Sequence, residues 1–168
     1  MIIRTEQPED FPGIYDLVKR AFETAAVSSG DEQNFVNNLR ESEAYIPELT
    51  LVAEENGELI GHIMISHKTI EADSQQFPIL YVAPLSVALE HRKKGIGSQL
   101  MREGLRLARE LGHTSVVLVG DPAYYHRFGF ETAAQFGIHD THGIPEENVM
   151  VCELTEGALD GVSGTIEF

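Results

Sequence analysis

The pattern of apolar residues changes at Gly95 and Gly97, and this change limits the folds that the chain can adopt. The preceding run, ILYVAPLSV at positions 79–87, is continuously apolar, as a buried strand would be. After the glycines, apolar residues recur every three or four positions between Leu100 and Leu111, as on one face of a helix. A strand that leads through a glycine turn into a helix is typical of domains that pack helices on a sheet.

The rest of the chain alternates between strand and helix signals. Residues 48–66 contain two apolar runs around Asn56-Gly57, a pair that favours a type I′ β-hairpin. Pro84 cannot donate a ladder hydrogen bond, so we expect a bulge or interruption there. Helices are expected from Pro8 and after a Ser29–Glu32 capping box, and further strands at 1–5, 114–120 and 149–154. We predict an α/β (α+β) domain with a mixed sheet of six to seven strands flanked by helices.

Length and composition suit one soluble domain. The 168 residues are 42% hydrophobic and 23% charged, which predicts a single domain over 1–168. No apolar run approaches the ~20 residues that cross a bilayer. The start, MIIRTEQPED, lacks the pattern of a signal peptide, so we expect a cytoplasmic protein without a membrane partner.

The formal charge of −15 is unevenly distributed, with no Lys or Arg after Arg127. Such acidity repels phosphate backbones and argues against nonspecific nucleic-acid binding. It is mildly compatible with a cationic substrate; the alternative is that the acidity serves solubility alone.

Against this acidic background, Arg92, Lys93 and Lys94 precede Gly95 and Gly97. The first amides of a helix lack intrahelical partners and carry partial positive charge. Glycines let an anion approach these amides closely, and the neighbouring cations add donors. The stretch therefore predicts a phosphate or pyrophosphate site. The alternative is a glycine turn beside a solvated run of charges.

Two common nucleotide motifs do not fit this stretch. A P-loop places its lysine after the glycines, whereas Lys93 and Lys94 come before them. A dinucleotide-binding fingerprint needs a third glycine where Leu100 stands.

The pattern that remains is Arg/Gln-x-x-Gly-x-Gly/Ala, present as Arg92 to Gly97. A second stretch, AYYHRFGF at 123–130, contains Tyr125 followed by Gly129-Phe130. With these two stretches and its order of elements, the chain resembles the GCN5-related N-acetyltransferase (GNAT) superfamily over roughly residues 1–154. The resemblance implies one N-acetyltransferase domain with a core over 1–154 and a C-terminal extension over 155–168. Its ending, GALDGVSGTIEF, is similar to that of a bacterial subgroup, the YhbS-like proteins.

The resemblance implies a GNAT-like acyl-CoA N-acyltransferase fold that uses acetyl-CoA as co-substrate and no metal. It implies that the strand ending at Val87 separates from the strand 114–120, that the pantetheine arm enters between them, and that the Val87 amide donates to the thioester carbonyl. The coenzyme-binding residues would be Ser86, Val87, Arg92, Lys93, Lys94, Gly95, Ile96, Gly97 and Ser98.

Tyr125 matches the position of the usual general acid of the superfamily. A tyrosine has a pKa of ~10 and a thiol ~8.5, so Tyr125 would be protonated near neutrality and able to donate to the leaving thiolate. The alternative is a core aromatic beside Tyr124 and Phe128.

The general base is left open. Where some relatives carry a glutamate, this chain has Tyr81, and a water chain ending on Tyr81, His67 or Asp121 could serve instead. Leu89 stands where many relatives have proline. Gly120-Asp121-Pro122 stands where many have an asparagine that contacts the pantetheine.

Together these features predict direct acetyl transfer from acetyl-CoA to a primary amine of a small molecule or protein. Cys152 is expected to be a small buried hydrophobe and not a nucleophile, and His139 and His142 are expected to lie in a solvated loop without a metal. A homodimer is possible. The alternative function is a non-catalytic acyl-CoA-binding sensor or interaction module.

Overall fold

Two long strands, β3 (Glu58–Glu71) and β4 (Gln76–Val87), connect the two units of the computed structural model, which describes residues 1–25 and 28–168. The first unit contains Met1–Ser66 and Ala83–Leu107, and the second contains His67–Val82 and Ala108–Phe168. Because both long strands belong to both units, the prediction of one catalytic domain over 1–168 stays a prediction.

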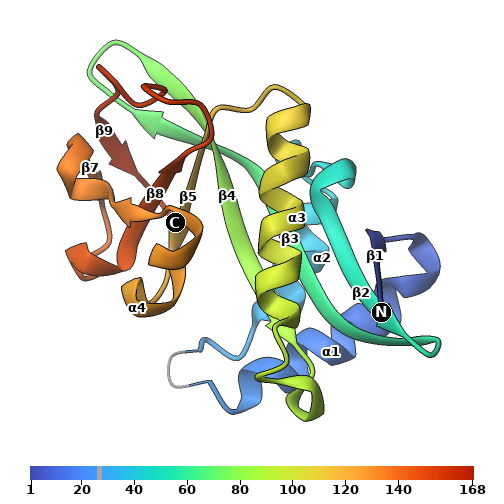
Figure 1. Ribbon diagram of the computed structural model, residues 1–168. Helices are drawn as coiled ribbons and strands as arrows, with labels where there is room; N and C mark the ends of the chain where they lie inside the picture. The colour runs from blue at the N-terminus through green and yellow to red at the C-terminus, as the bar shows by residue number, and fades with distance from the viewer. Residues whose placement is uncertain (26–27) are drawn as a thin grey trace. The chain divides into compact units, whose positions relative to one another are not determined.

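The strands pair in the order β1-β2-β3-β4-β5-β8-β6, and β9 pairs with β3 and β7. The described residues form nine strands and four α-helices, and this confirms the predicted mixed α/β fold (Figure 1). The strand count exceeds the predicted six or seven because β6, β7 and β9 have only two or three residues, too few to show a period. The remaining bounds are β1 (Ile2–Thr5), α1 (Phe11–Glu23), α2 (Glu32–Arg40), β2 (Thr50–Glu55), α3 (Ile96–Glu110), β5 (Ser115–Val119), α4 (Pro122–Tyr125), β6 (Glu131–Thr132), β7 (Ile138–Asp140), β8 (Val149–Glu153) and β9 (Gly164–Ile166).

In the first unit, β2 and β3 form the hairpin that the sequence predicts. Asn56 and Gly57 both have positive φ, 52° and 78°, as a type I′ turn requires. The turn places Glu55 opposite Glu58, and the register then shifts by one residue between Ala53 and Glu54. Strand β1 is antiparallel to the other edge of β2.

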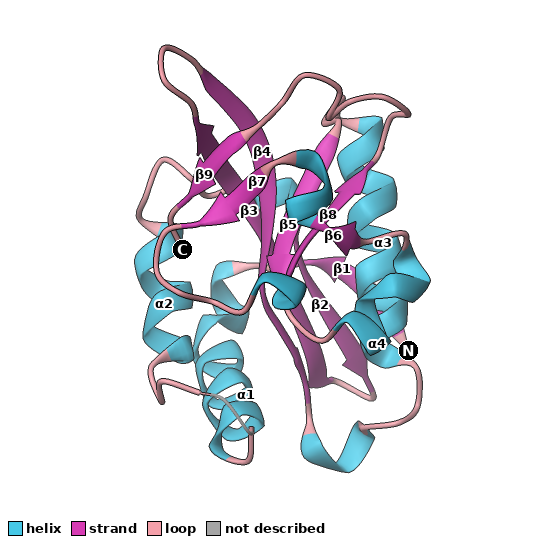
Figure 2. Ribbon diagram, turned by 90° about the vertical axis from the view of Figure 1, so that its left-hand side faces the viewer, coloured by secondary structure: helices cyan, strands magenta, loops and turns pink. Residues whose placement is uncertain are grey.

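Helices cover both faces of these strands (Figure 2). On one face, Ile14 and Val18 of α1 pack with Val52 and Met64. On the other face, α3 lies so close that a Cβ added at Gly61 would stand 2.8 Å from a methyl group of Leu100. The helical period after Gly97 is thus explained by the face of α3 that packs on β3.

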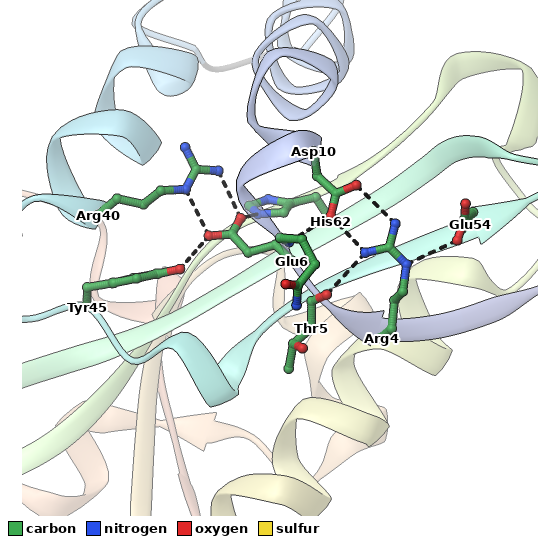
Figure 3. Close-up of polar contacts among 9 residues, drawn as sticks. Arg4, Thr5, Glu6, Asp10, Arg40, Tyr45, Glu54 and His62 are labelled. Carbon is green, nitrogen blue, oxygen red and sulfur yellow. Dashed lines mark hydrogen bonds and ion pairs between the residues drawn. The ribbon is translucent and has the colours of Figure 1, made fainter.

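A buried carboxylate fastens α2 to the first unit (Figure 3). The side chain of Glu6 is 0% exposed and accepts two 2.8 Å hydrogen bonds from Arg40. Tyr45 Oη donates to it at 2.6 Å, and His62 Nε2 lies 3.3 Å away. Burial alone would raise the pKa of Glu6, but the hydrogen bonds lower it to about 2. Burial lowers the pKa of His62, so this histidine is neutral and its Nε2–H donates.

The second unit has its own core around β5 and β8. Strand β5 runs parallel to β4 and antiparallel to β8. The extension that the sequence did not place is part of this core, since Leu159 is 3% and Ile166 0% exposed and β9 pairs with both β7 and β3. The buried residues of this core are Ile70, Ile79, Val117, Ala133, Ile138, Val149, Val151, Leu159 and Ile166.

Within the described part of the chain, no helix is long and apolar enough to cross a membrane.

Candidate functional site

The N-terminus of α3 carries the glycine loop. The first intrahelical bond runs from the Gln99 N–H to the Gly95 carbonyl at 3.0 Å. The N–H groups of Ile96 and Gly97 therefore have no acceptor within the helix. They point outward at the N-terminus of α3, which carries partial positive charge. The side chain of Ile96 is buried at 5% exposure. This residue thus anchors the helix in the core and offers a ligand only its backbone.

The loop before the helix turns through two left-handed residues. Lys93 has φ 63° and Gly95 has φ 81°, and glycine is the residue that adopts such a conformation without strain. Lys93, Lys94 and Gly95 are exposed. Two cations thus stand beside the amides at the start of α3, as an anion site needs.

Arg92 has a contact that the sequence did not reveal. Its Nη2 donates to the carbonyl of Ala21 at 2.7 Å, and Ala21 lies in the last turn of α1. A cation at this end of a helix is favoured by the helix dipole. Arg92 therefore fastens the loop to α1, although it is itself exposed, and Lys93 and Lys94 are the other exposed cations of the loop.

The end of β4 presents a backbone donor. Ala88, just beyond the strand, donates its N–H to the Ile60 carbonyl of β3 at 2.8 Å. Successive amides of an extended chain point to opposite sides, so the Val87 N–H points away from β3. The Ser86 hydroxyl is buried and has no hydrogen-bond partner among the described residues.

In the second unit, the pairing of β4 with β5 is short. Leu80 is opposite Val116 and Tyr81 opposite Val117. After Val117, β5 is paired with β8 and no longer with β4. Val119, the last residue of β5, is 38% exposed. Strand β4 itself continues through Pro84 to Val87. The predicted interruption at Pro84 is therefore not a break in the strand.

Tyr125 ends α4, a single turn that Asp121 caps by accepting from the Ala123 N–H at 2.9 Å. Its ring packs edge-on against Tyr124 and Phe130. Burial raises the pKa of Tyr125 to about 12. The phenol is therefore protonated throughout the physiological range and can act as a hydrogen-bond donor.

Gly120 lies directly against the Tyr125 ring. Any Cβ at position 120 would collide with that ring. The backbone of Gly120 is held from both sides by Asn148, whose carbonyl accepts from the Gly120 N–H at 2.9 Å and whose Nδ2 donates to the Gly120 carbonyl at 3.1 Å. Sequence reasoning missed Asn148, which is 28 positions away in the chain and has no local signal.

The three candidates for a base lie in different settings. Burial raises the pKa of Tyr81, so its phenol is protonated at neutrality. The Asp121 carboxylate is engaged as a helix cap. The His67 ring lies 5.8 Å from that of His113. None of them is a buried carboxylate base, so the base stays unassigned.

Tyr81 also contacts two residues that the sequence did not place near it. The ring of Phe168, the last residue, lies 5.3 Å from the Tyr81 ring, and Lys68 Nζ stands 4.8 Å from the centroid of Tyr81. The extension thus reaches the position where some relatives carry a glutamate.

Other reactive groups are structural. Cys152 is 4% exposed and burial raises the pKa of its thiol. No group of three or more potential metal ligands occurs among residues 1–25 and 28–168. His139 lies in β7 and not in the predicted loop, but it is exposed, as is His142. The Nδ1 of His139 lies 3.7 Å from the Glu146 carboxylate, and the Nε2 of His142 lies 3.7 Å from that of Glu167.

A mixed sheet with helices on both faces of its first strands and a glycine-rich, cationic helix start defines an α/β domain that can hold an anionic ligand. The Acetyltransferase (GNAT) domain model matches residues 2–133. The chain belongs to the GNAT family of acetyltransferases, and the resemblance inferred from Arg92–Gly97 and 123–130 is confirmed.

Relatives agree over the whole chain. The chain is 36% identical to the uncharacterized N-acetyltransferase YhbS of Escherichia coli, over 100% of this chain and 96% of that protein. The crystal structure of E. coli YhbS in complex with CoA superposes with a TM-score of 0.86 over 99% of this chain and 88% of that one. A GNAT family acetyltransferase from Brucella melitensis in complex with acetyl-CoA is 30% identical, with a TM-score of 0.81 over 99% and 94% of the two chains. The predicted enzyme class is thereby confirmed.

Proposed function

We propose that the protein transfers an acetyl group directly from acetyl-CoA to a primary amine. The observation that carries this proposal is the start of α3, where the amides of Ile96 and Gly97 lie beside Lys93 and Lys94. The YhbS and Brucella structures, which contain CoA and acetyl-CoA, support the same ligand here.

In this proposal the loop binds the pyrophosphate of the coenzyme mainly through its backbone. Backbone donors at a helix start suit phosphate oxygens, since they need no side chain to be ordered on binding. Lys93 and Lys94 neutralise charge locally on a protein whose net charge is −15. Arg92 acts indirectly, by holding the loop against Ala21. Ser86 and Ser98 complete the predicted set.

At the thioester, the Val87 N–H donates to the carbonyl oxygen, which gains negative charge when the amine attacks. Its direction away from β3 leaves it available for this role. The C–N bond forms as the C–S bond breaks, the sulfur leaves as a thiolate, and Tyr125 Oη donates a hydrogen bond or proton to that sulfur. No covalent enzyme intermediate is needed, which agrees with the burial of Cys152.

The amine must lose a proton before or during attack. Neither Tyr81 nor Asp121 is set up as a direct base, so we propose that water carries this proton out of the site. The acceptor belongs to the class of primary amines, of small molecules or proteins. A cytoplasmic location and a possible homodimer stay predictions.

A thiol-release assay tests the enzyme against its alternative, an acyl-CoA-binding module. The full chain is incubated with acetyl-CoA and, in separate reactions, polyamines, aminoglycosides, amino acids and peptides. We expect release above the hydrolysis background with at least one amine. Thermal stabilisation by coenzyme A without any amine-dependent release would instead support the binding module.

A further inference from the structure

We propose that a cavity in the first unit is a binding site for a small organic cation with an apolar body, coupled to the coenzyme loop. The proposal concerns residues other than those of the loop itself, and it stands or falls independently of acetyl transfer.

The cavity has a volume of about 360 Å³, within the ≈ 300–1,000 Å³ of small-molecule sites. Its walls are α1, the turn of the β2–β3 hairpin at Gly57, and the segment 88–90. Figure 1 shows these three parts at the same end of the first unit. No residue of the loop 92–98 is part of the lining, which consists of Gly13, Asp16, Leu17, Arg20, Ala21, Gly57, Glu58, Leu59, Ala88, Leu89 and Glu90.

The interior of the cavity is apolar. Leu17 and Ala21 line it from α1 and are 8% and 6% exposed, so they form its floor. Leu59 and Leu89 line it from the strand and the segment before the loop. A ligand that fills this space needs an apolar body, because the side chains there offer no hydrogen-bonding groups.

The rim is acidic. Asp16, Glu58 and Glu90 are exposed at the edge of the lining, and Arg20 is its one basic side chain. Arg20 Nη2 lies 3.6 Å from Glu90 Oε1, with both side chains more than half exposed. Three carboxylates against one guanidinium leave the rim with net negative charge. This favours a cationic head group over an anionic or neutral one.

Two contacts connect the cavity to the coenzyme loop. Residues 88–90 lead directly into Arg92, and Ala21, which lines the cavity, accepts the hydrogen bond from the Arg92 guanidinium. A ligand between α1 and the segment 88–90 contacts the two parts of the chain that position the loop. We therefore expect the occupied protein to bind coenzyme A more tightly, and by linkage coenzyme A to tighten binding of the cation.

The test is calorimetric titration of the full chain with hexyltrimethylammonium. This ion has a cationic head and an apolar body, and its quaternary nitrogen cannot be acetylated, so binding is measured apart from transfer. 1-Hexanol serves as the neutral control ligand. We expect one cation per chain, much weaker or no binding of hexanol, and a lower Kd for coenzyme A when the cation is present.

Variants locate the site. An exposed ion pair of up to 1 kcal/mol corresponds to about fivefold in Kd, so Asp16→Asn with Glu90→Gln should weaken binding of hexyltrimethylammonium by up to about 25-fold. Glu43→Gln with Glu48→Gln removes the same charge from exposed positions elsewhere in the first unit and should leave the Kd unchanged.

Equal affinity in the two double variants would overturn the proposal, as would no binding at millimolar cation. One-for-one displacement by coenzyme A would also overturn it, since the cation would then occupy the coenzyme site. Coenzyme affinities that are equal with and without the cation would refute the coupling. These binding measurements do not depend on acetyl transfer, so a failure to detect transfer would not affect them.

Discussion

Tyr125 illustrates how much a single side chain depends on its neighbours. In the proposed mechanism the phenol must point at the leaving sulfur. The orientation of the ring is set by its contacts with Gly120, Tyr124 and Phe130. The raised pKa, about 12, keeps the proton on the oxygen at neutral pH.

Replacing Tyr125 by phenylalanine removes the donor and keeps the ring. General acid catalysis contributes 10²–10⁴-fold, so we expect kcat to fall by about 10²-fold or more while the Kd for coenzyme A is unchanged. Tyr15→Phe on α1 is the matched control and should retain wild-type turnover. Equal turnover of Tyr125→Phe and wild type in the thiol-release assay would remove Tyr125 from the mechanism.

Gly120→Ala tests the positioning of that ring. The added methyl group displaces the Tyr125 ring, so we expect a loss in kcat at nearly constant Kd for coenzyme A. A double-mutant cycle identifies the route, because adding Tyr125→Phe to Gly120→Ala should cost almost nothing further. Fully additive losses would mean that Gly120 acts through something other than Tyr125.

Among the elements, the first turn of α3 carries the proposed anion binding. Its amides supply directed donors, and Lys93 and Lys94 supply charge. Charges on exposed side chains act through water and are screened by salt, whereas close backbone donors are less so. The two contributions can therefore be separated by ionic strength.

We expect Lys93→Gln and Lys94→Gln each to raise the Kd for coenzyme A by up to about fivefold at low salt, as exposed charges do. The increase should shrink at high salt, and turnover at saturating acetyl-CoA should be unaffected. Lys19→Gln on α1 is the control. A double lysine variant that binds like wild type at low salt would contradict a role for these cations.

The attachment of α2 has a pH dependence that follows from Glu6 and His62. Both have a pKa below the ordinary value, so the unfolded chain binds more protons than the folded one. The free energy of unfolding should fall as pH drops below about 6.5, where His62 protonates in the unfolded state, and again between about 4.5 and 2 for Glu6.

Ionised Glu6 contributes about 3 kcal/mol to the free energy of unfolding at neutral pH, because folding lowers its pKa from 4.5 to about 2. Urea unfolding at a series of pH values measures it. Glu6→Gln should be less stable at pH 7, and its free energy of unfolding should decline less between pH 4.5 and 2 than that of wild type. A decline remains because other carboxyls, such as Asp10 and Glu32, also have a lowered pKa. Exposed Glu48→Gln should keep the wild-type profile. A wild-type free energy of unfolding that is flat between pH 4.5 and 2 would disprove this assignment.

At the scale of the whole molecule, the features predictable from sequence are those written in neighbouring residues. Asn56-Gly57 is sufficient to predict the hairpin turn that it forms. Gly95 and Gly97 lie next to the exposed N–H groups at the start of α3. The contacts that could not be predicted join distant positions. Arg92 meets Ala21 across 71 residues, and Asn148 meets Gly120 across 28. No local pattern encodes such pairs, because they depend on how the elements pack.

The same distinction explains the extension. Residues 155–168 show no clear period, yet β9 completes the core of the second unit and Phe168 reaches Tyr81. Its short strand is held by neighbours on both sides and not by its own propensity.

The central claim is that the first amides of α3 bind the coenzyme pyrophosphate. Backbone amide NMR of ¹⁵N-labelled full chain, titrated with coenzyme A and separately with pantetheine, tests it directly. We predict that the amide resonances of Ile96 and Gly97 shift and saturate at one coenzyme A per chain, and that pantetheine, which lacks the diphosphate, leaves them in place. Coenzyme A binding with both resonances unmoved would contradict the account.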